Sequence, residues 1–471
     1  MKNQGVLPYV VETLKSSDTV TAWGGLPLVL ETMIALGVGR QVGRHVAIRE
    51  RDRGYSEARK IETLVLLMAS GGECIEDVER LRQDRGLCRL IGDLAGADAL
   101  RTFLYAFHDD ELIAKAQASR GPNQVAYIPE ENEALQGLGR VNVSFIRQAA
   151  AQGNCKRATL DHDATIQESH KRDALFHYKG GRGYQPSVIY WAEQDLVLAD
   201  EYRDGNVPAA MDNLRLIQRG FAALPERVTE WFFRSDTACY EDRVLKWLAN
   251  PNRADGPQGH IGFTIGADMT QDLRKVCEAA PASSWQRLED RPHETVYCTE
   301  VEFTPGNWSK DAQPLRYLAV RIDSKQRELL EEARAAKYLA VVTNRDGKVE
   351  DLLQWHWKKA GTIELVHDVA KNELGARVPP CGRFGANAAW FRISLLTYNV
   401  LSAMKSSVLP AKFNDARPKR LRFSLFTIAG RIISSGGKLI LRVAEEIEAH
   451  VNLVVARQRL AELAVAFSNT A

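Results

Sequence analysis

The chain has 471 residues, of which 45% are apolar and 26% charged, and its formal net charge is only +2. These values are ordinary for a globular protein with room for several domains. The N-terminus lacks the apolar core of a signal peptide, and no apolar run reaches the roughly 18 residues of a membrane span. We therefore expect a cytoplasmic protein that makes no membrane contact. Seven scattered cysteines without a CxxC pair indicate neither a zinc site nor a disulfide framework.

The first part of the chain, residues 1–150, is predicted to be helical. An apolar run covers residues 26–36, and Ser56 is placed to cap a second helix. Apolar residues continue at helical spacing to about residue 107. We expect a compact helical region with a charged face, and assign it to DNA binding.

The pattern changes near residue 154 and predicts an α/β domain with a mixed sheet. Alternating or apolar runs predict strands, and amphipathic runs predict helices. The expected order is strand, two strands around a short turn, helix, strand, helix and strand, at residues 157–163, 187–193, 196–202, 208–224, 228–236, 240–248 and 260–266.

Four further segments follow. Residues 282–337 are β-rich and are predicted to form an insertion between the two parts of the α/β domain, 151–281 and 338–405. Within the second part we expect one helix over residues 346–373 and a strongly apolar helix over 386–405. Residues 406–471 are assigned to a basic helical C-terminal region. Between Lys405 and Arg442 nine Lys or Arg stand against one acid, Asp415, which suits a phosphate backbone or, alternatively, a solvated basic face.

Acidic side chains stand at the ends of two predicted strands and on a late helix. Asp161 and Asp163 end the first strand, Asp236 ends the fourth, and Glu364 lies in the late helix. Converging carboxylates are the ligands that Mg²⁺ prefers, and two such ions are suited to phosphoryl transfer. Because strand-end Asp residues also cap turns, their positions alone are weak evidence for a metal site. His162 lacks partners at zinc-ligand spacing.

Several linked blocks resemble bacterial insertion-sequence transposases of the DDE transposase group 1. The first is DHDAT at residues 161–165, followed by YKGGRGYQP at 178–186 and EYRDGN at 201–206. FRSDTACY at 233–240 is similar to the second catalytic block of that family. KAGTIELVHDVAKNELGA at 359–376 is similar to the third. The blocks occur in the family's order over nearly the whole chain.

This resemblance implies an α/β, RNase H-like catalytic domain with a β-rich insertion between the second Asp and the Glu. It implies a metal-dependent endonuclease in which Asp163, Asp236 and Glu364 hold two Mg²⁺ ions, with Mn²⁺ as a substitute. The family's first acid belongs to an Asp-x-Thr/Ser unit, which favours Asp163 with Thr165. Asp161 remains a possible metal ligand, because residues two apart on a strand point the same way.

The chain departs from the family around its third acid. Related transposases carry Tyr-x2-Arg-x3-Glu-x6-Lys, whereas this chain has Trp357, Ala360, Glu364 and Lys371. Lys371 is expected on the same helical face as Glu364, where it would hold a DNA phosphate. The residues expected to bind DNA are Lys358 and Lys359 near the missing arginine, Lys371, and Lys419, Arg420 and Arg422 in the basic segment.

The implied function is DNA transposition. The protein would bind the terminal inverted repeats of its element, cleave the ends, and join the 3′-OH to target DNA. Its partners would be double-stranded DNA and a second copy of itself in a synaptic complex, and it would be associated with a bacterial nucleoid. Two alternatives remain: an RNase H-like nuclease that does not integrate, and a catalytically inactive DNA-binding protein derived from a transposase.

Overall fold

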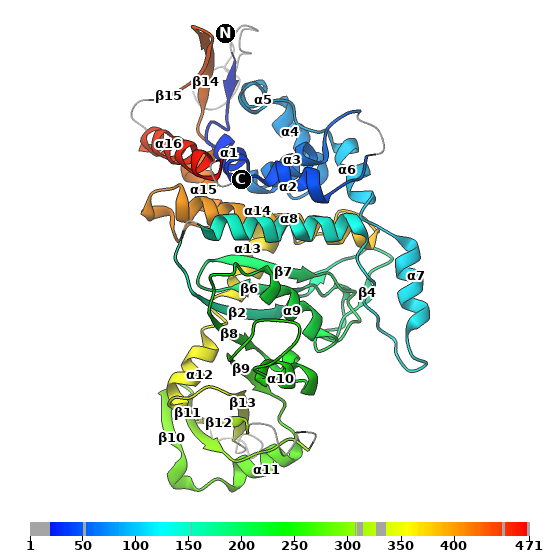
Figure 1. Cartoon of the computed structure of the whole chain (residues 1–471), viewed down its shortest axis with the longest axis vertical. Coiled ribbons are helices and arrows are strands. Elements are labelled where there is room, and N and C mark those ends of the chain that lie inside the picture. The colour runs from blue at the N-terminus through cyan, green and yellow to red at the C-terminus, as the bar shows by residue number, and fades with distance from the viewer. Residues whose placement is uncertain are drawn as a thin grey trace, which may run out of the picture.

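The computed structural model describes residues 19–49, 53–151, 153–306, 308, 314–325, 336–444 and 448–468. The molecule is elongated, with helices at one end, a large sheet in the middle and a β-rich extension at the other end (Figure 1). Within the described ranges, no helix combines the length and the apolar character that crossing a membrane requires.

The N-terminal region is helical, as its apolar spacing predicts. Ser56 caps its third helix by accepting a hydrogen bond from the backbone N–H of Arg59. The helices are α1 (Pro27–Ala35), α2 (Val38–His45), α3 (Glu57–Ser70), α4 (Val78–Gln83), α5 (Arg85–Ile91), α6 (Ala97–Tyr105), α7 (Asp110–Ser119) and α8 (Glu133–Ala151).

A nine-stranded mixed sheet forms the middle of the molecule, in the order β10-β11-β12-β13-β9-β8-β2-β6-β7. Strands β2, β6 and β7 are antiparallel neighbours, whereas β8 and β9 run parallel to β2. These five strands are β2 (Arg157–Ala164), β6 (Ser187–Trp191), β7 (Leu196–Glu201), β8 (Glu230–Ser235) and β9 (Ile261–Ala267). Helices α9 (Asn213–Ala223), α10 (Asp242–Ala249) and α11 (Gln271–Ala279) follow β7, β8 and β9 in the chain.

The β-rich insertion continues this sheet. Four strands extend it in chain order: β10 (Gln286–Asp290), β11 (Glu294–Val301) and β12 (Arg316–Ser324) lie within the predicted insertion, residues 282–337, and β13 (Lys337–Thr343) begins the part of the α/β domain that follows. The last of them pairs antiparallel with β9, with Ala340 opposite Ala267. These four strands and the five strands described above therefore form one continuous hydrogen-bonded sheet.

The predicted helix over residues 346–373 is wrong in one respect, because the structure has two helices there. Helix α12 (Val349–Trp357) and helix α13 (Ile363–Glu373) are separated by a short turn that contains Gly361. At the break, the Thr362 hydroxyl donates a 2.5 Å hydrogen bond to Asp161 on β2. Trp357 and Ala360 thus do not share a helix with Glu364.

Helix α14 (Phe384–Ser407) is the central support of the molecule, and every residue from Gly385 to Met404 is buried. It lies beside α8, between the N-terminal helices and β7 (Figure 1). Its polar residues form hydrogen bonds and ion pairs with the neighbouring elements. The Asn399 amide, for example, accepts from the backbone N–H of Val197 at 2.7 Å.

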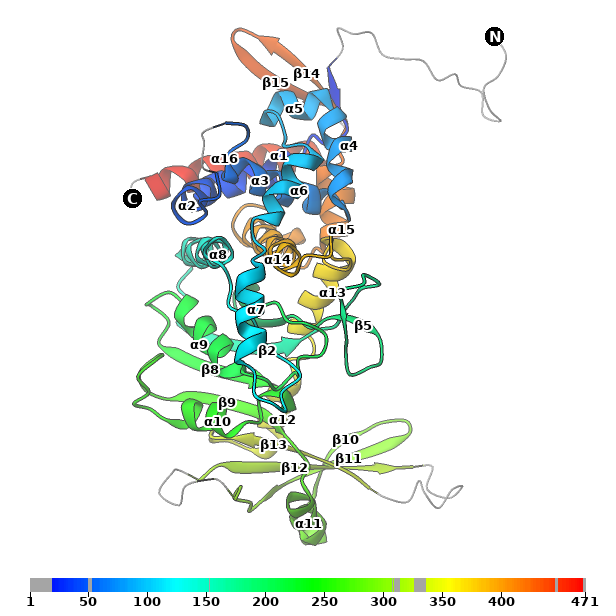
Figure 2. The same ribbon diagram turned by 90° about the vertical axis from the view of Figure 1, so that its right-hand side faces the viewer.

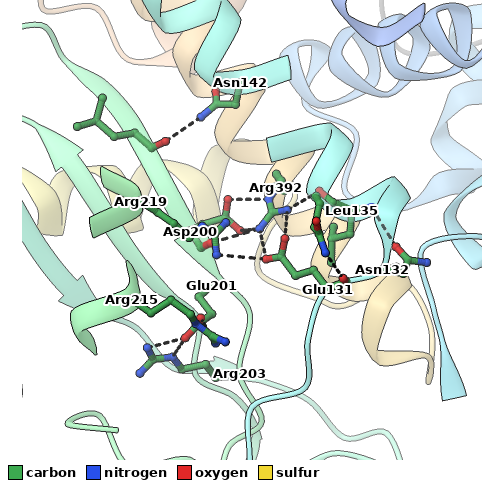
Figure 3. Close-up of polar contacts among 12 residues, drawn as sticks. Glu131, Asn132, Leu135, Asn142, Asp200, Glu201, Arg203, Arg215, Arg219 and Arg392 are labelled. Carbon is green, nitrogen blue, oxygen red and sulfur yellow. Dashed lines mark hydrogen bonds and ion pairs between the residues drawn. The ribbon is translucent and has the colours of Figure 1, made fainter. Parts of the chain in front are cut away.

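Buried ion pairs reinforce the same junction (Figure 3). On α14, Arg392 contacts Asp200 of β7 at 2.8 Å and Glu131, just before α8, at 2.7 Å. Glu201 accepts from Arg203 and, at 2.5 Å, from Arg215 of α9. The acids thus have guanidinium partners from several elements, which is the condition for stable buried charge.

The C-terminal region is not purely helical. After the short helix α15 (Pro418–Leu421), strands β14 (Gly430–Ser435) and β15 (Lys438–Val443) form a hairpin that pairs with β1 (Val20–Thr21). Its turn is Gly436-Gly437, both with positive φ, which is the geometry that favours glycine in two-residue hairpins. Helix α16 (Glu448–Ser468) follows and packs on α1.

Candidate active site

Asp163 and Asp236 lie at the carboxyl ends of neighbouring parallel strands. In the ladder between β2 and β8, Asp161 stands opposite Arg234. Asp163 lies two residues further along β2, and Asp236 directly follows the last residue of β8, so both acids reach the same edge of the sheet, on chains about 5 Å apart. Asp236 is exposed and caps the following turn by accepting from the Ala238 N–H at 3.0 Å.

Helix α13, which carries Glu364, packs against β2 near the end of that strand. His367 Nε2 lies 3.4 Å from Asp163 Oδ2, and the Lys371 ammonium donates to the hydroxyl of Thr165. Glu364 precedes these residues by three and seven positions, so all three share one helical face. Glu364 itself is exposed in the first turn of the helix.

Asp163 is largely buried among positive and polar groups. Lys359 Nζ lies 3.3 Å from Asp163 Oδ1 and also donates to the carbonyl of His162 at 3.2 Å. Burial alone would raise the pKa of Asp163, but the neighbouring His367 and Lys359 hold it well below its ordinary value. The carboxylate is therefore ionised at neutral pH.

Asp161 has a different environment, although it faces the same side of the strand. Both of its oxygens contact the Arg234 guanidinium, at 2.6 and 2.8 Å, and Oδ2 also accepts from Thr362. Its side chain is fully buried, and burial raises its pKa against the opposing effect of Arg234. Arg234 in turn donates to the carbonyl of Trp355 at 2.7 Å. The pair joins β2, β8 and α12.

The residues expected to bind DNA lie in two kinds of environment. Exposed positions are occupied by Lys358, directly after α12, and by Lys419 and Arg420 on α15. The remaining three have protein partners: Lys359 contacts Asp163, Lys371 contacts Thr165, and Arg422 donates to the carbonyls of Ala69 and Glu373.

The sequence did not predict the environment of Asp163, because His367 was not singled out and Lys359 was expected to bind DNA. His367 stands in the third family-like block, three residues after Glu364, and this helical spacing was the available signal. The contact of Lys359 with Asp163 spans 196 residues of sequence, and no local pattern predicts it.

The donor set fits a hard cation, because all three candidate ligands are carboxylates and Asp163 is ionised. In the part of the chain that the structure describes, no group of three or more His, Cys, Asp or Glu side chains is gathered as a metal site. Mg²⁺ is commonly held by one or two carboxylates together with substrate phosphates. Asp236 and Glu364 are exposed, and this exposure is compatible with that mode.

Comparison with known proteins identifies the family. Residues 10–465 match the family described as transposase DDE domain group 1. Among solved structures, the piggyBac transposase in a synaptic complex with hairpin DNA is similar, with a TM-score of 0.47 and 10% identity, over 87% of this chain and 81% of that one. No curated protein matches. Because the family match spans nearly the whole chain, the predicted family is confirmed, and the protein belongs to the DDE transposases of group 1.

Proposed function

We propose that the protein is an active DNA transposase that cleaves the ends of its element and joins them to target DNA. Asp163, Asp236 and Glu364 are the proposed catalytic and metal-binding residues. The observation that carries this proposal is the position of the two Asp residues at the ends of adjacent parallel strands, with α13 lying over the end of β2.

The order of the core strands supports an RNase H-like catalytic domain. β7, β6 and β2 form an antiparallel set, and β8 and β9 continue it in parallel. In this arrangement the first and fourth strands of the domain are neighbours. Acids at their ends can therefore act on one phosphate.

The chain's own residues have distinct proposed roles. When bound, two Mg²⁺ ions would activate the attacking oxygen and stabilise the leaving one. Asp163 offers an ionised carboxylate, and the pairing of Asp161 with Arg234 favours Asp163 as the ligand. Lys358 is exposed beside this site and is suited to a DNA phosphate, as is Lys371 if its contact with Thr165 opens.

Double-stranded DNA is the proposed partner, at both the inverted repeats and the target, and a homodimer would bring two ends together. The exposed Lys419 and Arg420 on α15 are the proposed contacts with the backbone. Their removal should weaken binding to all DNA sequences about equally and reduce its dependence on salt.

The decisive experiment compares Asp236→Asn with Asp242→Asn in the full chain. Asp242 is an acid six residues later, in the first turn of α10, and serves as the matched control. Cleavage of DNA that carries the element ends should require Mg²⁺ or Mn²⁺ and stop when EDTA is added. We expect Asp236→Asn to bind the ends and fail to cut them. Cleavage by this variant in Mg²⁺ would overturn the assignment.

Supplying pre-cut ends separates transposition from simple nuclease activity. A transposase joins the 3′-OH of such ends to a target plasmid, whereas a nuclease leaves them free. If the wild-type chain binds the ends but neither cuts nor joins them, the protein is the inactive DNA-binding alternative.

A further inference from the structure

A small β-module follows Asp163 directly in the chain. The connection from β2 to β6 forms a three-stranded sheet in the order β3-β5-β4, made of β3 (Gln167–Glu168), β4 (Leu175–Phe176) and β5 (Arg182–Tyr184). Figure 2 shows β5 as part of a loop that projects from the body of the molecule. We call β4, β5 and the turn between them the β4–β5 hairpin.

The base of the β4–β5 hairpin is fixed to the core. Tyr184 is buried, and the Tyr202 hydroxyl donates to Gln167 Oε1 at 2.5 Å. Gly205 packs so closely that an added Cβ would lie 2.6 Å from the carbonyl oxygens of Leu175 and Gly183. The hairpin therefore projects from a rigid support.

The tip of the hairpin is held by its own hydrogen bonds. His177 N–H donates to the Gly181 carbonyl at 2.8 Å, and Gly180 N–H donates to the His177 carbonyl at 2.9 Å. Gly180 has a φ of +88°, a conformation that side chains rarely adopt. The His177 ring is buried and accepts from the Lys179 N–H through Nδ1. The tip is thus preformed.

Two largely exposed aromatic rings stand on the hairpin, Phe176 on β4 and Tyr178 at the tip. Tyr178 is 74% exposed and Phe176 is 60% exposed. Both are large, and neither belongs to a hydrophobic cluster of the described residues. An uncovered pair of aromatic side chains on a rigid element indicates a binding surface rather than a packing contact.

The rings are accompanied by positive charge. The module carries Lys171, Arg172, Lys179 and Arg182 against Glu168 and Asp173. Arg182 stacks on Phe176 at 4.7 Å, and Lys179 lies 5.7 Å from the ring centre of Tyr178. Among the residues that the structure describes, none of these four cations forms a salt bridge. Their charge remains available to phosphates.

The hairpin lies next to the candidate active site. The Lys371 ammonium contacts Thr165, two residues before β3; burial lowers the pKa of Lys371, and the charge of Lys179 on the hairpin lowers it further. On β3, the Gln167 side chain donates to the carbonyl of Ala376, just after α13. A DNA strand held by the hairpin would therefore be close to Asp163.

We propose that the β4–β5 hairpin binds an unpaired stretch of DNA beside the cleavage site, with bases stacked on Tyr178 and Phe176 and phosphates contacted by Lys179. In a duplex the faces of the bases are covered by their neighbours, so only unpaired bases offer a surface to these rings. Stacking tolerates any base, and Arg182 behind Phe176 reinforces it. This inference rests on the proposed function, because it assumes a DNA substrate.

The test measures binding of the full chain to a short oligo(dT) strand and to a short mixed-sequence duplex that lacks element sequence, in EDTA. Fluorescence anisotropy gives both affinities. The double variant Phe176→Leu/Tyr178→Leu should bind the strand at least about tenfold more weakly and the duplex with little change. The matched variant Phe176→Tyr/Tyr178→Phe keeps both rings and should bind the strand like the wild type.

A strand that carries 2-aminopurine provides a direct readout of stacking. Its fluorescence should be quenched by the wild type and by the ring-preserving variant, and not by the leucine variant. Equal binding of the strand by all three proteins, or equal losses for strand and duplex in the leucine variant, would overturn the inference. Cleavage by Asp236→Asn would instead overturn the proposed function, so the two failures are distinguishable.

Discussion

Two clusters of charged side chains in this molecule differ in how their charges are compensated. At the β7 edge, Glu131, Asp200 and Arg392 form a buried network in which each acid meets a guanidinium (Figure 3). At the carboxyl end of β2, Asp163 is buried against Lys359, while Asp236 and Glu364 are exposed.

The difference indicates that the first cluster stabilises the fold and that the second is suited to binding. A buried ion pair with all partners present fixes the relative position of the elements that carry it, and removing one partner is costly. A half-open cluster can exchange its partners for a cation or a phosphate. The same contrast occurs at close range within β2, where Asp161 is locked to Arg234 and Asp163 is not.

The largest expected effect comes from replacing Asp163 and Asp161 one at a time. Asp163→Asn should reduce DNA cleavage by more than about a thousandfold, because the proposed ligand and its charge are lost. Its melting temperature should change little, since the amide oxygen can still accept from Lys359. Asp161→Asn should instead lower the free energy of unfolding by about 3–5 kcal/mol, because the buried Arg234 guanidinium loses its counter-charge and one of the two oxygens that accept from it. Urea unfolding and a cleavage assay on both variants check this. The reverse pattern would make Asp161 the metal ligand.

The next largest effect is a loss of stability expected when the buried network of Glu131, Asp200 and Arg392 is broken. Arg392→Met leaves Glu131 and Asp200 without their main partner and should lower the free energy of unfolding by about 3–5 kcal/mol. Arg219 lies at the exposed rim, 3.5 Å from Glu131, so Arg219→Met should cost less than about 1 kcal/mol. Chemical denaturation measures both. Similar small losses in both variants would contradict a structural role for the network.

The pH dependence of stability should report the same network. Although burial opposes it, Arg392 lowers the pKa of Glu131 to about 2. A depressed folded-state pKa contributes stability above the ordinary carboxyl pKa, and this contribution is lost as the pH falls towards 2. The wild type should therefore exceed Glu131→Gln by about 2–3 kcal/mol at neutral pH, with the difference shrinking below about pH 5. Glu133→Gln, at an exposed position of α8, should show no such convergence.

The sequence predicted the elements that depend on local pattern. The alternating runs that end in Asp163 and Asp236 are strands, and the apolar run after residue 385 is the buried helix α14. Hydrophobic periodicity is a property of the segment itself, so it can be seen without knowing the neighbours. The roles of the three acids are a different matter, since the family resemblance and not the pattern singled them out.

What the sequence did not predict depends on partners far along the chain. The break before α13 is accompanied by the bond from Thr362 to Asp161, which spans 201 residues, and Gly361 alone opposes a helix only weakly. The pairing of β13 with β9 likewise has no local signal. The β14–β15 hairpin did have one, the Gly436-Gly437 turn between two runs that contain isoleucine, but the whole basic region was predicted to be helical.

The smallest predicted effect tests whether the partner of Asp163 is exchangeable. The Lys359 ammonium lies 3.3 Å from the carboxylate that is proposed to hold a divalent cation, so it repels that cation and competes with it. Lys359→Met removes the charge and retains most of the buried volume. We expect the variant to bind Mn²⁺ about three- to tenfold more tightly, as measured by calorimetry without DNA. Lys358→Met, one residue earlier and exposed, should leave the affinity unchanged. Weaker Mn²⁺ binding by Lys359→Met would mean that Lys359 positions Asp163 instead of competing for it. The contrast between the fully paired cluster at β7 and the half-open cluster at β2 would then not hold for Asp163.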